Sequence, residues 1–128
     1  MNVFFAEMKN TRYEHMEIHF EELPLFSKEL RALSKKYRSL PEDLMEFKRV
    51  LSVIPQGNGK HFCVLQKNTQ TTIVKARLFC RYLKGSSLRI IYAYHTQKIC
   101  IKFIELYFKG DKENENHERI SQYLKNSL

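Results

Sequence analysis

The sequence lacks the features of several classes of protein. No apolar run approaches the roughly 18 residues that a membrane-spanning helix needs. The three cysteines, Cys63, Cys80 and Cys100, are widely spaced, and no Cys-x-x-Cys or Cys/His pattern has the spacing of a zinc site. Residues 1–7 have no basic region and include an acid, unlike a signal peptide. We therefore expect a reduced, cytosolic protein without a metal ion or cofactor.

The remaining composition is that of a folded domain. The chain has 128 residues, of which 43% are hydrophobic and 12% are aromatic. A chain of this length can bury a core without disulfides or metals, and this hydrophobic content excludes an intrinsically disordered protein. No internal repeat or low-complexity tract is present. We expect one domain, or two at most.

Acidic residues are almost absent from the middle of the chain. The net charge is +8, from 22 basic and 14 acidic side chains, and residues 1–50 contain nine of each. Residues 51–110 contain one acid, Glu105, and ten basic side chains: Lys60, Lys67, Lys75, Arg77, Arg81, Lys84, Arg89, Lys98, Lys102 and Lys109. This concentration favours a polyanionic partner, either nucleic acid, an acidic peptide or a membrane surface, over a solvated basic face that binds nothing.

Two amphipathic helices are predicted in the first half of the chain. Apolar residues recur at intervals of three and four from position 23 to position 37, and again from position 40 to position 54. Ser39 and Glu42 have the Ser-x-x-Glu form of a capping box at the start of the second helix. Pro55 and Gly57 end it. The short turn between the two helices indicates a helical hairpin.

The second half is predicted to be mostly strands. Residues 14–20 form a short first strand by their alternation, and residues 55–71 form a polar loop. Three strands follow at residues 71–80, 88–94 and 99–108, and their short connections indicate an antiparallel meander. A last helix is predicted over residues 118–124. The fold class is therefore α+β, an antiparallel sheet packed against an N-terminal helical hairpin with a C-terminal helix. We expect Lys75, Arg77 and Arg81 to line the sheet face or edge that the helices leave open.

This order of elements, with these strand residues, resembles the RelE/ParE superfamily of toxins from bacterial type II toxin–antitoxin modules, and in particular a ParE-like subfamily. The resemblance covers about residues 15–125, so residues 1–13 are expected to be an N-terminal extension and residues 14–128 the toxin domain. The residues that carry it are Lys75-Ala76-Arg77-Leu78, Ser87-Leu88-Arg89-Ile90-Ile91-Tyr92, Phe103-Ile104-Glu105-Leu106-Tyr107-Phe108-Lys109-Gly110-Asp111-Lys112, Lys35-Lys36-Tyr37 and Pro41-Glu42-Asp43-Leu44.

The resemblance implies a cytoplasmic toxin that a cognate antitoxin neutralises, with no membrane partner. Many relatives are mRNA interferases that cut ribosome-bound mRNA without a metal ion. The ribose 2′-OH attacks the adjacent phosphate, which requires a base, cations for the phosphorane charge and an acid for the leaving oxygen. The ParE branch instead inhibits DNA gyrase. A third alternative is an inactive toxin fold that acts with an antitoxin-like repressor.

The resemblance also implies a set of site residues. Its candidate catalytic residues are Lys75, Arg77, Arg89, Tyr107 and Lys109. Its candidate nucleic-acid-binding residues are Lys75, Arg77, Arg81, Lys84, Arg89, Lys102, Lys109 and Lys112.

Each of these residues also has a structural interpretation. Arg89 could pair with Glu105, which in turn could orient an arginine or act as a base. Lys75 and Arg77 could form a solvated strand face, and Tyr107 could belong to the core. We expect His95 to lie at the surface in a turn, and Cys80 and Cys100 to be buried and inert.

Overall fold

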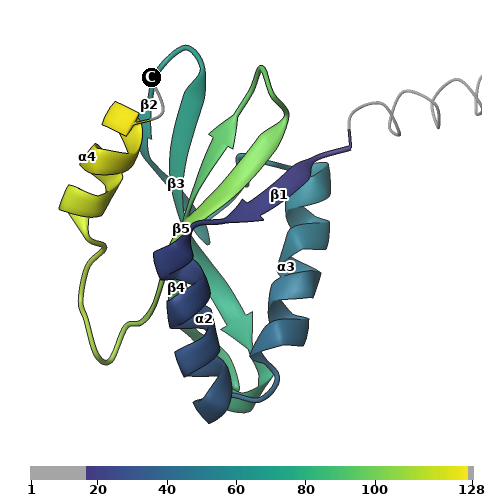
Figure 1. Cartoon of the computed structure of the whole chain (residues 1–128). Coiled ribbons are helices and arrows are strands. Elements are labelled where there is room, and N and C mark those ends of the chain that lie inside the picture. Colours follow the sequence, from purple (N-terminus) through teal and green to yellow (C-terminus); the bar gives the residue numbers. More distant parts are fainter. Residues whose placement is uncertain (1–16, 127–128) are drawn as a thin grey trace, which may run out of the picture.

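The computed structural model describes residues 17–126, which form one five-stranded sheet with helices on both faces (Figure 1). Across the sheet the strands are arranged in the order β1-β5-β4-β3-β2. In chain order the elements are β1 (His19–Glu22), α2 (Pro24–Lys36), α3 (Leu40–Val53), β2 (Phe62–Lys67), β3 (Thr71–Cys80), the 3₁₀ turn η1 (Arg81–Leu83), β4 (Gly85–His95), β5 (Cys100–Phe108) and α4 (His117–Asn126).

The sheet is mixed. Strands β3 to β5 pair antiparallel, as the meander predicts, and β2 pairs antiparallel to β3, whereas β1 pairs parallel to β5. The expectation of a wholly antiparallel sheet is therefore wrong for β1. Two helices separate β1 from the meander, and a connection of that length allows a strand to return in either direction.

The first strand lies later in the chain than predicted. Its alternation predicts residues 14–20, but β1 is His19–Glu22 and Ile18 is buried just before it. Phe20 stacks on Phe103 of β5, with ring centroids 5.9 Å apart. Residues 14–16 of the predicted strand, like the predicted extension at residues 1–13, lie outside the described residues.

Strand β2 lies within the segment predicted to be a loop. Its residues are mostly exposed, and its register with β3 shifts between Val64 and Gln66. An edge strand that buries neither face and contains a bulge has no alternation of apolar and polar residues to detect. Strand β2 and the residues before it border the candidate functional site.

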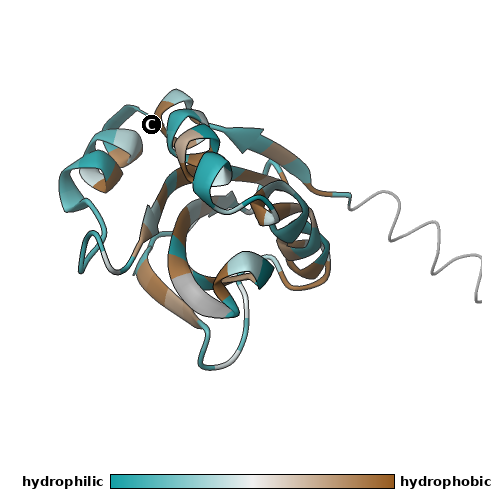
Figure 2. Cartoon of the chain, turned by 90° about the horizontal axis from the view of Figure 1, so that it is seen from below, coloured by the Kyte–Doolittle hydropathy of each residue, from teal (hydrophilic) through white to brown (hydrophobic). Residues whose placement is uncertain are grey.

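Helices α2 and α3 cover one face of the sheet. The spacing of their apolar residues predicts both helices, and both are present. Their buried residues join a core with the β3 side chains Val74, Ala76 and Leu78, and with Tyr92 and Phe103. Figure 2 shows hydrophilic and hydrophobic residues alternating along these helices and strands, as expected for elements with one buried side.

The start of α3 differs from the predicted capping box. The Ser39 hydroxyl donates to the Asp43 carboxylate at 2.6 Å and accepts the Tyr82 N–H at 3.1 Å. Glu42 accepts a hydrogen bond from Arg81 at 2.6 Å. The capping box is therefore wrong, because contacts with the turn η1 take up both side chains that it requires.

Helix α4 covers part of the opposite face (Figure 1). Its buried Ile120 joins a second core with Ile73, Ile91 and Ala93.

His95, predicted to lie at the surface, is buried at the end of β4. Its ring contacts the hydroxyls of Thr71, at 3.1 Å, and of Tyr123 in α4. Burial, followed by the nearby Lys102 and Lys98, lowers the pKa of His95.

Phe26 is expected to be a main contributor to stability. It is fully buried and its ring lies 5.2 Å from that of Phe103. Phe26→Ala should lower the free energy of unfolding by about 3–5 kcal/mol, because it removes apolar contacts and leaves a cavity. The neighbouring Leu25 is 53% exposed, and Leu25→Ala should change stability by less than about 0.5 kcal/mol. Urea unfolding measures both, and equal losses would contradict the assignment of the core.

Candidate functional site

Four polar side chains lie in a row across three adjacent strands and the residue that precedes a fourth. Arg77 of β3 pairs in register with Arg89 of β4, and Arg89 pairs with Tyr107 of β5. The Arg77 N–H donates to the carbonyl of His61 at 3.0 Å, which extends the ladder by one residue before β2. Residues directly opposite each other share a face, with Cβ atoms about 4.5–5.5 Å apart. We call His61, Arg77, Arg89 and Tyr107 the cross-strand row.

A small basic cavity lies over one end of this row. Its volume is about 230 Å³. It brings together four of the five predicted catalytic residues, Lys75, Arg77, Arg89 and Lys109, although they are up to 34 positions apart in the sequence. Its lining also includes Lys60, His61, Phe62, Cys63 and Ala76. A concave site with this density of cations is suited to an anion of the size of a phosphate group.

Arg89 is the buried cation of the row. Only 9% of the residue is exposed, and its Nη1 donates to the carbonyl of Leu88 at 3.2 Å. Burial, and then the charge of Arg77, lower the pKa of Arg89 below its ordinary value. An arginine remains charged under such conditions. A buried guanidinium interacts strongly with a bound anion because the local dielectric constant is low.

Lys75 belongs to an ion pair inside the site. Its Nζ lies 2.9 Å from Oε1 of Glu115, whose side chain is only 6% exposed. Burial by itself would raise the pKa of Glu115, but the hydrogen bond from Lys75 and the other local bonds leave it below its usual range. A lysine acts as a general base only when its amine is neutral and faces the substrate. In this arrangement the ammonium of Lys75 is already bound to a carboxylate, so Lys75 is better placed as a fixed cation.

Glu105 binds the segment that follows β5 onto the sheet. Its side chain is fully buried and pairs with Lys112, and its Oε1 accepts the Asn116 N–H at 2.9 Å. Arg119 of α4 lies 3.9 Å from the same carboxylate and 2.6 Å from that of Glu29 in α2. Glu105 thus anchors the loop. Lys112, a predicted nucleic-acid-binding residue, is one of the partners of Glu105 in this contact.

Tyr107 closes the inner end of the row. Its hydroxyl is buried and has no hydrogen-bond partner among the described residues. Burial, together with the charges of Glu115 and Glu105, raises the pKa of Tyr107 to about 12. The Lys112 ammonium lies 5.0 Å from the centre of its ring. The hydroxyl is therefore protonated at neutral pH, and it can donate a hydrogen bond if a ligand reaches it.

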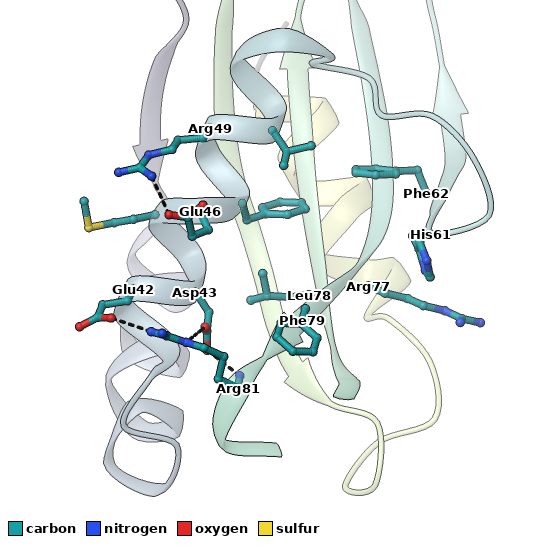
Figure 3. Close-up of a pocket in the computed structure, with 13 residues that line it drawn as sticks. Glu42, Asp43, Glu46, Arg49, His61, Phe62, Arg77, Leu78, Phe79 and Arg81 are labelled. Carbon is teal, nitrogen blue, oxygen red and sulfur yellow. Dashed lines mark hydrogen bonds and ion pairs between the residues drawn. The ribbon is translucent and has the colours of Figure 1, made fainter. Parts of the chain in front are cut away.

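Besides Lys112, three predicted nucleic-acid-binding residues lie outside the cavity. Arg81 points back to α3, where its Nη2 lies 2.6 Å from Glu42 and its Nε 3.3 Å from Asp43. Figure 3 shows Arg81 directed toward these acids and Arg77 directed away from them. The expectation that Arg81 shares the face of Lys75 and Arg77 is wrong, because a register shift between Leu78 and Cys80 ends the alternation of β3.

Lys84 and Lys102 are the other two. Lys84 has a left-handed backbone, with φ of 51°, at the end of the turn η1. Lys102 lies 4.0 Å from Glu21 of β1, and it lines a separate groove between α2 and α4. Both side chains lie away from the basic cavity.

Sequence reasoning missed three residues that border the site: Lys60, His61 and Glu115. Lys60 and His61 belong to the segment predicted to be a loop, where no apolar alternation places them. The contact between Glu115 and Lys75 joins residues 40 positions apart, and no local pattern predicts such a contact. Among the described residues, no three side chains of His, Cys, Asp or Glu are grouped to bind a metal ion.

A larger apolar groove lies between α3 and the β2–β3 edge. Its volume is about 740 Å³. Met45, Val50 and Phe79 line it and are 44–57% exposed. His61, Phe62 and Arg77 line both this groove and the basic cavity. Figure 3 shows His61 and Arg77 together on the side of the groove away from α3. The two hollows therefore adjoin each other at the edge of the sheet.

Comparison with known structures shows the fold. The crystal structure of the archaeal RelE–RelB complex from Pyrococcus horikoshii OT3 matches with a TM-score of 0.57 and 21% sequence identity, over 73% of this chain and 96% of the other. No protein family and no curated protein matches the sequence. The chain therefore has the RelE fold, in agreement with the resemblance of its strands. In the described part, no helix combines the length and hydropathy of a membrane span.

Removal of the Glu105 carboxylate should release the segment that it anchors. Glu105→Ala leaves the charges of Lys112 and Arg119 near a buried apolar side chain, and we expect a loss of about 3–5 kcal/mol in stability. Amide hydrogen exchange should become faster in residues 109–126 than in β3 and β4. The exposed Glu113 is the matched control, and Glu113→Ala should leave exchange unchanged. Unaltered protection of α4 in Glu105→Ala would contradict this role.

Proposed function

We propose that this chain is the toxin of a type II toxin–antitoxin module and acts as a ribosome-dependent mRNA endonuclease. The observation that carries the proposal is the basic cavity, in which Arg77 and Arg89 lie on neighbouring strands with Lys75 and Lys109 beside them. The RelE fold and the family-like strand sequences support the same assignment.

The arrangement suits attack by a ribose 2′-OH on the adjacent phosphate. That reaction gathers negative charge on the phosphorane, and cations that are already fixed around the phosphorus stabilise it without reorganisation. Arg77 and Arg89 can each offer a planar pair of N–H donors to phosphate oxygens. Lys75 is held by Glu115 at 2.9 Å and adds a third positive charge. No metal ion is needed for this chemistry.

The partner in this proposal is a cognate antitoxin, as RelB is for the archaeal RelE. The apolar groove between α3 and the β2–β3 edge suits an amphipathic segment, and Arg77 at its far wall suits an acidic residue of that segment. Because the groove and the cavity share His61, Phe62 and Arg77, a chain in the groove would also cover the cavity.

Arg89 should be required for toxicity. Expression of the parent chain without its antitoxin should arrest growth and cut mRNA within codons on translating ribosomes, as primer extension would map. Arg89→Ala should reduce cleavage by about 100-fold or more, because it removes a buried cation that faces the phosphate. Arg89→Lys should restore only part of the activity, because lysine lacks the planar pair of donors.

The control for Arg89 is Arg31→Ala, since Arg31 is an exposed arginine on α2 far from the cavity in sequence and fold. It should be as toxic as the parent. Circular dichroism checks that Arg89→Ala is folded. Intact mRNA with supercoiling defects would favour the ParE-like inhibitor of DNA gyrase. Absence of any growth phenotype would favour the inactive module that acts with a repressor.

Phe79 should contribute to antitoxin binding. It lines the groove, and 57% of it is exposed; Tyr82 is also 57% exposed but does not line the groove. Phe79→Glu should weaken binding of the antitoxin by about 30-fold, because the complex loses an aromatic side chain that the antitoxin would bury. Tyr82→Glu should bind nearly as the parent does. Titration calorimetry measures both, and equal affinities would refute the groove as the binding surface.

A further inference from the structure

The proposed cleavage needs a group that accepts the proton of the 2′-OH, and this inference rests on the proposed function. Lys75, one of the candidate catalytic residues, has its ammonium 2.9 Å from the Glu115 carboxylate. Tyr107 carries a buried hydroxyl, and its pKa is raised to about 12, chiefly by burial. Arginine does not give up its proton in proteins. None of these groups is suited to act as the base.

His61 is placed where such a base is needed. Its backbone accepts the Arg77 N–H at 3.0 Å, so it stands opposite Arg77 at the outer end of the cross-strand row. It is exposed, and it lines the basic cavity together with Arg77, Arg89 and Lys109. An imidazole is the side chain that exchanges a proton most readily near neutral pH. The position therefore combines access to substrate with direct proximity to the phosphate-binding cations.

We propose that His61 is the general base of the cleavage. The His61 imidazole takes the proton of the 2′-OH while O2′ forms its bond to phosphorus. The bond between phosphorus and O5′ breaks, and the ammonium of Lys109 gives a proton to the departing O5′. The products are a 2′,3′-cyclic phosphate and a 5′-OH, and solvent returns both groups to their starting protonation states. Arg77 and Arg89 stabilise the phosphorane throughout.

The surroundings of His61 favour this role. The charged and titratable groups that line the same cavity are Lys60, Cys63, Lys75, Arg77, Arg89 and Lys109. Every charged side chain among them is a cation. His61 also lines the apolar groove, where the charged side chains are Glu42, Asp43, Glu46, Arg49, Arg77 and Arg81. Arg81 forms ion pairs with both Glu42 and Asp43, and Arg49 pairs with Glu46 at 2.6 Å.

The test measures single-turnover cleavage of mRNA on stalled ribosome complexes by the full-length chain, over a range of pH. His61→Gln keeps a polar side chain of similar size but cannot exchange a proton in this range. We expect cleavage about 100-fold or more slower, with the decline of rate toward low pH lost. RNA binding should change by less than threefold. The control is His19→Gln, because His19 is an exposed histidine on β1 at the opposite edge of the sheet.

A second variant distinguishes chemistry from structure. His61→Ala should regain part of its cleavage rate when free imidazole is added, whereas Arg89→Ala should not. If the parent cleaves and His61→Gln cleaves at the same rate with the same pH profile, the inference is overturned and the proposed function stands. Failure of imidazole to rescue a folded His61→Ala would also overturn it. If the parent cleaves no mRNA, both the proposed function and this inference fail.

Discussion

The buried carboxylate of Glu105 determines how the chain leaves the sheet. An uncompensated charge in this position would be strongly destabilising, so the residues after β5 must fold back to supply partners. Lys112, the Asn116 N–H and Arg119 do so. This path has two consequences. It brings Glu115 to Lys75, and it starts α4 over the second apolar core, so the helix covers that part of the face and the outer end of the cross-strand row stays accessible.

In the fold, positive charge is distributed differently from the way it is distributed along the sequence. The basic middle segment contains one acid, but acids from the nearly neutral ends return to it in the fold. Glu115 pairs with Lys75, Glu42 and Asp43 pair with Arg81, and Glu21 lies near Lys102. Lys75 stays in the basic cavity as a paired cation, whereas Arg81 and Lys102 lie outside it. The location of the positive surface therefore follows from these pairings as much as from composition.

The helices and strands that can be predicted from the sequence are those with one apolar face. The spacing of Phe26, Leu30 and Leu33 predicts α2, and that of Leu44, Phe47 and Leu51 predicts α3. The alternation of Val74, Ala76 and Leu78 predicts β3. The strand motifs predict Arg77 and Arg89 as site residues, and both line the basic cavity. The exposed, bulged strand β2 has no such pattern, so His61 could not be placed beside Arg77. Arg81 was misplaced because a register shift cannot be seen in alternation, and Glu115 because its contact is long-range.

The wall that the groove shares with the cavity has a thermodynamic consequence. Two ligands that compete for the same side chains, His61, Phe62 and Arg77, each lower the apparent affinity of the other, and the reduction grows with the saturation of the competitor. Occupancy of either hollow then depends on the relative concentrations of the two ligands. If the proposed substrate and antitoxin are these two ligands, the chain would respond to their ratio, and abundant substrate would delay its capture by the antitoxin.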